Sequence, residues 1–138
     1  MKVVIDTNVF VAAMRSGGGA SRDVLRKSIT GPLQPIFGNA LWLEYLDVLG
    51  RDGWGGQSTP QERREVLSAL ALRGQWITIY YNWRPNLPDE GDNHLIELAL
   101  AGGADVIITH NVRDIRAGEL HFQGLRIVTP REMLEEMK

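Results

Sequence analysis

The sequence contains no cysteine, very little lysine and no long apolar run. The absence of cysteine excludes disulfides, thiolate metal sites and cysteine nucleophiles. No apolar stretch approaches the roughly 20 residues that a membrane-spanning helix requires. The first residues have the pattern of a strand rather than that of a signal peptide. We therefore expect a protein without a membrane segment, located in the cytoplasm.

The charged residues are unevenly distributed between types. The 138-residue chain has a net charge of −2, so it has no overall basic field to attract nucleic acid. Its cations are 12 arginines against 3 lysines. Arginine is the better bidentate phosphate ligand, so this bias is compatible with a phosphate-bearing substrate.

Short apolar runs alternate with helical patterns along the whole chain. The runs predict strands at residues 3–5, 35–37, 77–80, 105–108 and 126–128. Between them, apolar spacing and capping residues predict helices, including one that Asn39 caps, one that Ser21 caps and one that opens with Thr59-Pro60. The helix at 40–49 is apolar on nearly every side, which predicts burial of most of its faces. This alternation predicts a single α/β domain, residues 1–138, with helices around a central parallel sheet.

Acidic residues fall where such a sheet would gather them. Asp6 ends the first strand and Asp114 follows the fourth, and ligands of open α/β sheets bind beyond the carboxyl ends of the strands. Asp92 opens a helix on its inward stripe, and Glu44 lies within the apolar helix. Three of the four have an ordinary alternative, because Asp6 and Asp92 also suit helix starts and Asp114 a solvated loop, whereas Glu44 within an apolar helix fits an ordinary role least well. Asp105 begins a strand, so we expect it on the opposite edge.

Four carboxylates in one crevice would repel one another and raise one another's pKa values. A cation relieves this repulsion, and all-oxygen ligands suit Mg²⁺ or Mn²⁺ better than zinc. Such an ion, with water left in its shell, is typical of phosphoryl transfer.

The remaining candidates are weaker. No serine, histidine and acid stand at the spacing of a nucleophile elbow. His94 is expected to point away from the Asp92 face, whereas His110 is near enough to the crevice to touch a phosphate. The tryptophans are interpreted as core and loop anchors, except Trp54, whose glycine-rich loop makes it a candidate for contact with RNA or a partner.

Several blocks together resemble the PIN-domain family. They are Val-Val-Ile-Asp-Thr-Asn-Val-Phe at the start, Leu-Trp-Leu-Glu-Tyr-Leu-Asp-Val-Leu around Glu44, and Asp-Asn-His-Leu-Ile-Glu-Leu-Ala from Asp92, followed by Gly-Gly-Ala-Asp-Val-Ile-Ile-Thr. The likeness covers almost the whole chain and is greatest to the compact prokaryotic branch, the toxins of toxin–antitoxin pairs. It implies a three-layer sandwich with parallel strand order 3-2-1-4-5 and a metal-dependent ribonuclease. Asp6, Glu44 and Asp92 match the first three acidic positions.

The fourth acidic position departs from the family pattern. Many relatives have an aspartate two residues after the threonine that ends strand four, where this chain has Asn111. Asp114 is the alternative carboxylate, and Asn111 is an alternative ligand through its carbonyl oxygen. The loss of one charge should weaken a second metal site more than the first.

The resulting hypothesis is hydrolysis of RNA phosphodiesters by a site that binds Mg²⁺ or Mn²⁺. Asp6, Asp92 and either Asp114 or Asn111 would hold the ion, and Glu44 would ligate it or orient water. Groups expected to fix these carboxylates are Thr7, Asn8 and Thr109, and the candidates for contacts with the RNA backbone are Arg15, Arg113 and Arg116.

Three other classes and two partners complete the expectations. A catalytically weak PIN-fold module that binds RNA or a partner is the main alternative, and Asn111 favours it. A response-regulator receiver needs a lysine at the end of its last strand, but none lies between Lys27 and Lys138. A haloacid-dehalogenase-type phosphatase would have an aspartate where Asn8 stands. The resemblance also implies an antitoxin protein and a homodimer.

Overall fold

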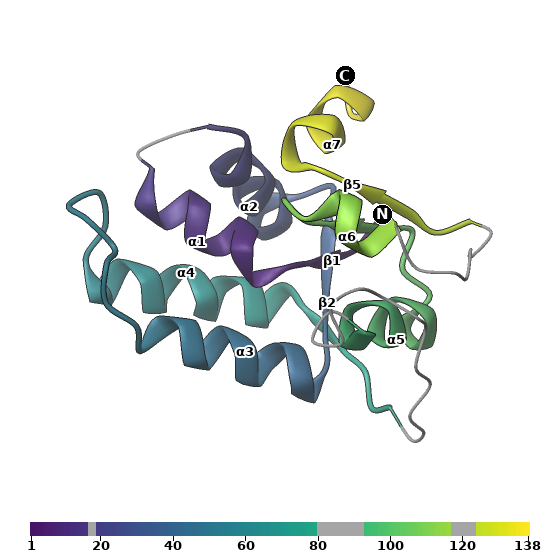
Figure 1. The fold of residues 1–138 in the computed structure, drawn as a ribbon, viewed down its shortest axis with the longest axis horizontal. Coiled ribbons are helices and arrows are strands. Elements are labelled where there is room, and N and C mark those ends of the chain that lie inside the picture. Colours follow the sequence, from purple (N-terminus) through teal and green to yellow (C-terminus); the bar gives the residue numbers. More distant parts are fainter. Residues whose placement is uncertain (17–18, 80–92, 117–123) are drawn as a thin grey trace.

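Five parallel strands form one sheet in the computed structural model, which describes residues 1–16, 19–79, 93–116 and 124–138. Their order is β3-β2-β1-β4-β5, as the family resemblance implies. Figure 1 shows β1, β2 and β5 among the surrounding helices. The strands are β1 (Lys2–Ile5), β2 (Gln34–Phe37), β3 (Gln75–Trp76), β4 (Val106–Ile108) and β5 (Arg126–Val128). The predicted parallel α/β fold is confirmed.

The central strands form because their residues are apolar and mostly β-branched on both faces. Val3 and Val4 of β1 are fully buried, as are all three residues of β4. A parallel sheet covered on both faces requires such continuous apolar runs. Ile5 pairs with Ile108, so β1 and β4 end side by side.

The helices are α1 (Thr7–Arg15), α2 (Ala20–Thr30), α3 (Asn39–Leu49), α4 (Pro60–Arg73), α5 (Asn93–Gly102), α6 (Val112–Arg116) and α7 (Pro130–Glu136). Two of them, α4 and α7, begin with capping boxes, Thr59 with Glu62 and Thr129 with Glu132. In each box, the threonine accepts a hydrogen bond from the glutamate amide and the glutamate accepts one from the threonine amide.

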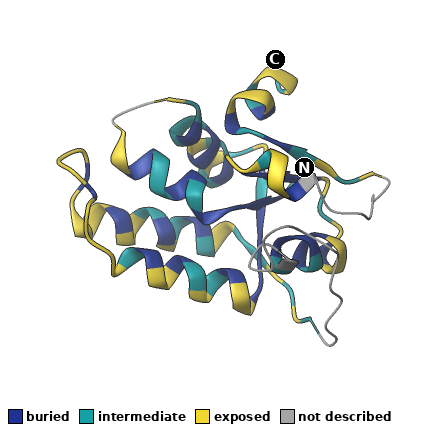
Figure 2. Cartoon of the chain, in the orientation of Figure 1, coloured by how far each residue is buried: buried dark blue, intermediate teal, exposed yellow. Residues whose placement is uncertain are grey.

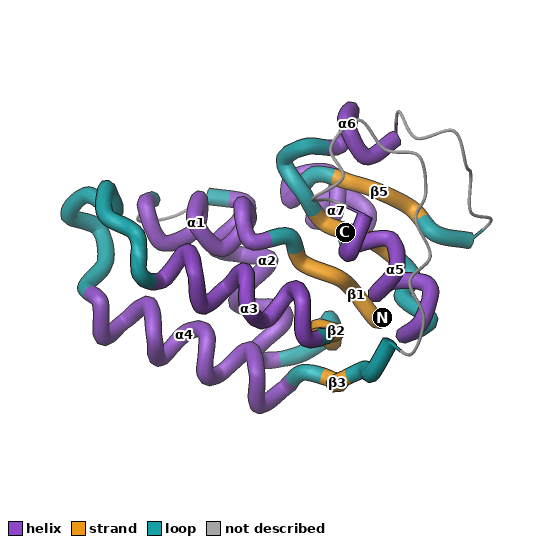
Figure 3. The backbone as a smooth tube through the Cα atoms, turned by 60° about the horizontal axis from the view of Figure 1, so that its bottom comes forward, coloured by secondary structure: helices purple, strands orange, loops and turns teal. Residues whose placement is uncertain are grey.

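Helices cover both faces of the sheet. Figure 3 shows α1 to α4 on one side of β1 and β2, with α5 on the other. This follows from right-handed crossovers, because the chain first steps from β1 to β2 to β3 and then returns past β1 to reach β4. The order of the strands reverses between β1 and β4, and a crevice is expected at their carboxyl ends.

Three local predictions about element boundaries are wrong. Gly38, not Asn39, is the N-cap of α3, and Ser21 lies inside α2, whose N-cap is Gly19. Strand β3 begins at Gln75, two residues earlier than predicted, and is only two residues long. Ile77 continues the pairing by donating its backbone N–H to the Phe37 carbonyl.

The expectation that α3 is buried on most faces is also wrong. Leu41, Tyr45 and Val48 form its buried stripe, while Leu43 is 55% and Leu46 is 45% exposed. Buried and exposed residues alternate along this helix in Figure 2. Within the described ranges, no helix has the length and apolar character needed to cross a membrane.

Trp54 is an anchor and not a surface contact. Its ring is 8% exposed, packs edge-on against Phe10 at 6.2 Å, and lies under the Arg63 guanidinium at 4.6 Å. Its indole N–H donates to the Arg51 carbonyl at 2.7 Å. These contacts attach the loop after α3 to the core, so the predicted role of Trp54 in contacting RNA or a partner is not supported.

Candidate active site

Asp6 lies at the point where the strand order reverses. It follows β1 directly, its backbone N–H donates to the Ile108 carbonyl at 2.9 Å, and its side chain is only 4% exposed. Although Asp6 occupies the N-cap position of α1, its side chain makes no capping hydrogen bond. The carboxylate instead accepts a hydrogen bond from Thr109 at 2.7 Å. The backbone N–H of Asn8, in the first turn of α1, also lowers the pKa of this carboxyl group, so the position of Asp6 at the helix start contributes to its environment as well.

Thr109, the residue after β4, forms hydrogen bonds with three polar residues at this edge of the sheet. Its fully buried hydroxyl donates to Asp6 Oδ2 and accepts from Asn8 Nδ2 at 3.3 Å and from the Asn111 backbone N–H at 3.0 Å. One donor and two acceptor positions are the full capacity of a hydroxyl group. The Thr109 hydroxyl therefore orients the Asp6 carboxylate, and the hydrogen bonds from Asn8 and Asn111 hold that hydroxyl in place.

Glu44, in the second turn of α3, approaches the same edge of the sheet, where its charge acts on Asp6. Its Oε1 accepts from the Thr7 hydroxyl at 2.6 Å, and its Oε2 lies 2.9 Å from His94 Nε2 on α5. This contact between His94 and Glu44 is not predicted from the sequence, whereas the Asp92 face, from which His94 is expected to point away, lies outside the described residues. Helical spacing predicts which residues of α5 lie on one face of that helix. The packing of α3 against α5 determines which residues that face contacts.

Two close contacts fix α3 in this position. A Cβ on Gly38 would lie 2.9 Å from Leu98 Cδ1, so glycine permits the start of α3 to approach α5. The fully buried Tyr45 donates its hydroxyl hydrogen to the Ile5 carbonyl at 2.7 Å. Since Ile5 immediately precedes Asp6, Tyr45 joins α3 to the end of β1 and orients its neighbour Glu44.

The electrostatics of the two carboxylates differ. Burial raises the pKa of Asp6 above its ordinary value, the charge of Glu44 raises it further, and the hydrogen bond from Thr109 opposes both. The hydrogen bond with His94 lowers the pKa of Glu44, aided by the one from Thr7, while burial opposes them. Burial also raises the pKa of Tyr45, which keeps its hydroxyl protonated as a donor. Asp6 is thus the carboxylate whose charge is least compensated.

The other predicted site residues are less closely connected to Asp6 and Glu44. Asp92 lies outside the described residues. Asn111 reaches Thr109 through its backbone N–H, and its side chain is exposed. Asp114 is exposed in the first turn of α6, and no hydrogen bond or ion pair links it to Asp6 or Glu44 in the described part of the chain.

The predicted backbone-contacting arginines have different positions. Arg113 is exposed on α6, which follows β4 at the carboxyl edge. Arg15 ends α1, at the opposite end of the helix from Asp6, and its guanidinium lies near Gly53. Arg116 is the last residue of α6, and its side chain lies outside the described residues.

The donor set suits a hard divalent cation. Asp6 is buried beside a second carboxylate, and oxygen ligands of this kind bind Mg²⁺ or Mn²⁺. Among the residues that the structure describes, no three histidine, aspartate or glutamate side chains form a complete metal cluster. Since Asp92 is not among those residues, the two described carboxylates fit part of a metal site.

A parallel 3-2-1-4-5 sheet with an aspartate buried at the reversal point defines an α/β protein of the PIN type. Residues 2–113 match the PIN domain family model, and the chain belongs to this family. It is also similar to a chain in the crystal structure of VapBC2 from Rickettsia felis bound to a DNA fragment from their promoter. That similarity has a TM-score of 0.60 at 12% identity and covers 94% of this chain and 98% of the other. No curated protein matches the sequence.

Proposed function

We propose that this protein is a metal-dependent endoribonuclease that hydrolyses RNA phosphodiester bonds. The observation that carries the proposal is the buried Asp6 carboxylate at the reversal point, with Glu44 near enough for its charge to raise the pKa of Asp6. Retaining two like charges together is costly for the free protein, and a bound cation relieves that cost. Membership of the PIN family supports nuclease chemistry at this position.

In this proposal Asp6, Asp92 and either Asp114 or Asn111 hold Mg²⁺ or Mn²⁺, with Glu44 as a further ligand or a group that orients water. When bound, such an ion lowers the pKa of a coordinated water and screens the phosphate charge. The chain's own contribution is to hold the carboxylates in place. Asn8 supports Thr109, which fixes Asp6.

Glu44 is held between a hydroxyl and an imidazole in the same way. Thr7 donates to one of its oxygens and His94 contacts the other, so neither oxygen is free to rotate away from the crevice. We assign His94 as a positioning residue for Glu44. Arg113 and Arg116 on α6 are the proposed contacts to the RNA backbone, whereas Arg15 would meet only a strand that extends along α1.

The proposed physiological role is that of the toxin in a toxin–antitoxin pair. The resemblance to the compact prokaryotic branch supports this role, as does the similarity in fold to a chain of the Rickettsia felis VapBC2 complex. An antitoxin would block the crevice, with a basic side chain opposite Asp6 and Glu44. We also propose a homodimer located in the cytoplasm.

The second candidate function is that of a PIN-fold module that binds RNA or a partner without cutting. Asn111 at the fourth acidic position favours it, as does the exposure of Asp114 to solvent. This alternative predicts RNA binding that persists after Asp6→Asn and does not depend on a divalent ion.

The test compares Asp6→Asn with Asp105→Asn, which makes the same chemical change at the other edge of the sheet. Each purified protein is incubated with structured and unstructured RNA in Mn²⁺, in Mg²⁺ or in EDTA. We expect Asp6→Asn to reduce cleavage by about 100-fold or more, because losing a ligand exceeds the 10- to 100-fold cost of losing an outer-shell group. Asp105→Asn should cleave like the unmodified chain. Cleavage that survives both EDTA and Asp6→Asn would contradict the proposal.

A further inference from the structure

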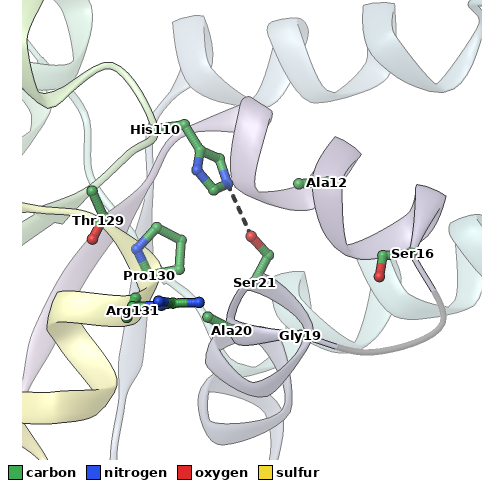
Figure 4. Close-up of a pocket in the computed structure, with 9 residues that line it drawn as sticks. All are labelled: Ala12, Ser16, Gly19, Ala20, Ser21, His110, Thr129, Pro130 and Arg131. Carbon is green, nitrogen blue, oxygen red and sulfur yellow. Dashed lines mark hydrogen bonds between the residues drawn. The ribbon is translucent and has the colours of Figure 1, made fainter.

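A second cleft, of about 460 Å³, lies between α1, the start of α2 and the start of α7. Figure 4 shows His110 and Ser21 directed toward one another across it and Arg131 extending along its floor toward Ala20. His110 Nε2 and Ser21 Oγ are 2.9 Å apart. The remaining walls come from small or apolar residues such as Ala12 and Pro130, which leave space beside the polar groups.

This cleft shares a wall with the crevice of Asp6. His110 follows Thr109 directly, and its backbone N–H donates to Asn8 Oδ1 at 3.2 Å. Asn8 in turn donates to Thr109, whose hydroxyl is bonded to Asp6. A continuous series of hydrogen bonds therefore runs from the acidic crevice to the wall of the second cleft, along the carboxyl edge of β1 and β4.

The acidic pair and the neighbouring cleft differ in charge. Asp6 and Glu44 are carboxylates whose charges interact, whereas no carboxylate is among the described residues that line the cleft, to which Arg131 contributes a cation. Arg131 is exposed and has no ion-pair partner within the described ranges. The planar guanidinium group suits bidentate binding of phosphate. The Ser21 hydroxyl and the His110 imidazole add hydrogen-bonding groups beside it.

We propose that this second cleft binds a phosphate of the RNA strand adjacent to the phosphodiester at Asp6 and Glu44. Arg131 supplies the charge, and Ser21 with His110 supplies the fixed hydrogen bonds. This inference rests on the proposed function, because a strand whose scissile bond lies at the acidic crevice must pass along the same edge of the sheet. The acidic crevice alone repels a polyanion, so a cationic site beside it provides attraction that the net charge of −2 does not.

The experiment measures binding without cleavage. Fluorescence anisotropy with a labelled single-stranded oligoribonucleotide in EDTA, on the Asp6→Asn background, gives Kd over a series of KCl concentrations. Arg131→Ala should weaken binding about 10-fold, as expected for a hydrogen bond to a charged group. It should also reduce the slope of log K against log salt by about 0.7, the value for one phosphate contact with a single strand. Arg131→Gln, which retains a long polar side chain, should show the same change of slope.

Arg64→Ala is the matched control, since Arg64 is an exposed arginine on α4 away from the cleft. It should change neither the affinity nor the slope. Ser21→Ala should weaken binding about threefold, as expected for a neutral hydrogen bond, and leave the slope unchanged. If Arg131→Ala and Arg64→Ala have the same affinity and slope, the inference is overturned. Dependence on Arg131 for binding poly-glutamate but not RNA would also overturn it.

Cleavage by the unmodified chain, measured in parallel, separates the two proposals. If RNA is cleaved and Arg131→Ala binds it normally, the phosphate site is wrong and the nuclease proposal stands. If no RNA is cleaved but Arg131→Ala loses affinity and slope, the phosphate site stands and the nuclease proposal fails.

Discussion

The two edges of the sheet carry aspartates that are chemically identical and structurally opposite. Asp6 follows β1 at the carboxyl edge, where it is 4% exposed, accepts from a buried hydroxyl and lies near the charge of Glu44. Asp105 precedes β4 at the amino edge, where it is exposed and accepts from the Lys2 backbone N–H at 3.0 Å. At the carboxyl edge, the burial of the Asp6 carboxylate lowers the stability of the fold. At the amino edge, the Asp105 carboxylate accepts a backbone hydrogen bond from Lys2 and so completes the pairing there.

The largest remaining effect is expected from Thr109, whose hydroxyl donates a hydrogen bond to Asp6. Thr109→Val keeps the shape of the side chain and removes the donor to Asp6, so we expect cleavage to fall about 10- to 100-fold. Thr109→Ser, which retains the hydroxyl, should stay within a few-fold of the unmodified chain. The readout is RNA cleavage in Mn²⁺. If the valine and serine variants cleave RNA equally fast, the hydrogen bond from Thr109 is not needed for the function of Asp6.

A smaller effect is expected from His94, the contact of Glu44 that sequence reasoning missed. The hydrogen bond with His94 is the largest cause that lowers the pKa of Glu44. His94→Gln should therefore raise the pKa of that carboxyl group and move the acidic limb of the pH–rate profile to higher pH. We expect cleavage at neutral pH to fall by up to about 10-fold.

The pH profile distinguishes positioning from a merely structural role. A uniform loss of rate at every pH, with no movement of the acidic limb, would contradict the assignment of His94 to Glu44. Arg64→Ala, which changes an exposed residue of α4, serves as the control and should leave the profile unchanged.

The smallest effect concerns stability, and its sign differs between the two edges. Burial raises the pKa of Asp6, so its ionised form destabilises the metal-free fold at pH values above the ordinary value of 3.8. Asp6→Asn should therefore raise the free energy of unfolding by about 1 kcal/mol at pH 7 in EDTA. This gain should shrink as the pH falls toward 3.8, because the unmodified carboxyl group then becomes protonated.

Asp105→Asn should act in the opposite direction, lowering the free energy of unfolding by about 0.5 kcal/mol through a weaker bond to Lys2. Urea denaturation of both variants at several pH values measures the two changes. Destabilisation by Asp6→Asn at pH 7 would show that the two edges do not differ as described.

The local sequence determined the elements and the edge on which each aspartate lies. Short apolar runs predict strands because a parallel sheet is buried on both faces, and capping boxes at Thr59 and Thr129 predict where two helices begin. The strand at β1 predicts the place of Asp6, and the start of β4 predicts that of Asp105. These features depend on neighbours within a few residues, which the sequence displays directly.

Only the tertiary structure decided which distant side chains meet. His94 contacts Glu44 because α5 packs closely against α3, and Ser21 contacts His110 because α2 lies beside the end of β4. Leu43 and Leu46 are exposed because nothing in the described part of the chain covers that face of α3, although their sequence pattern predicts burial. Such contacts join residues dozens of positions apart, and periodicity in one segment carries no information about the segment that packs against it.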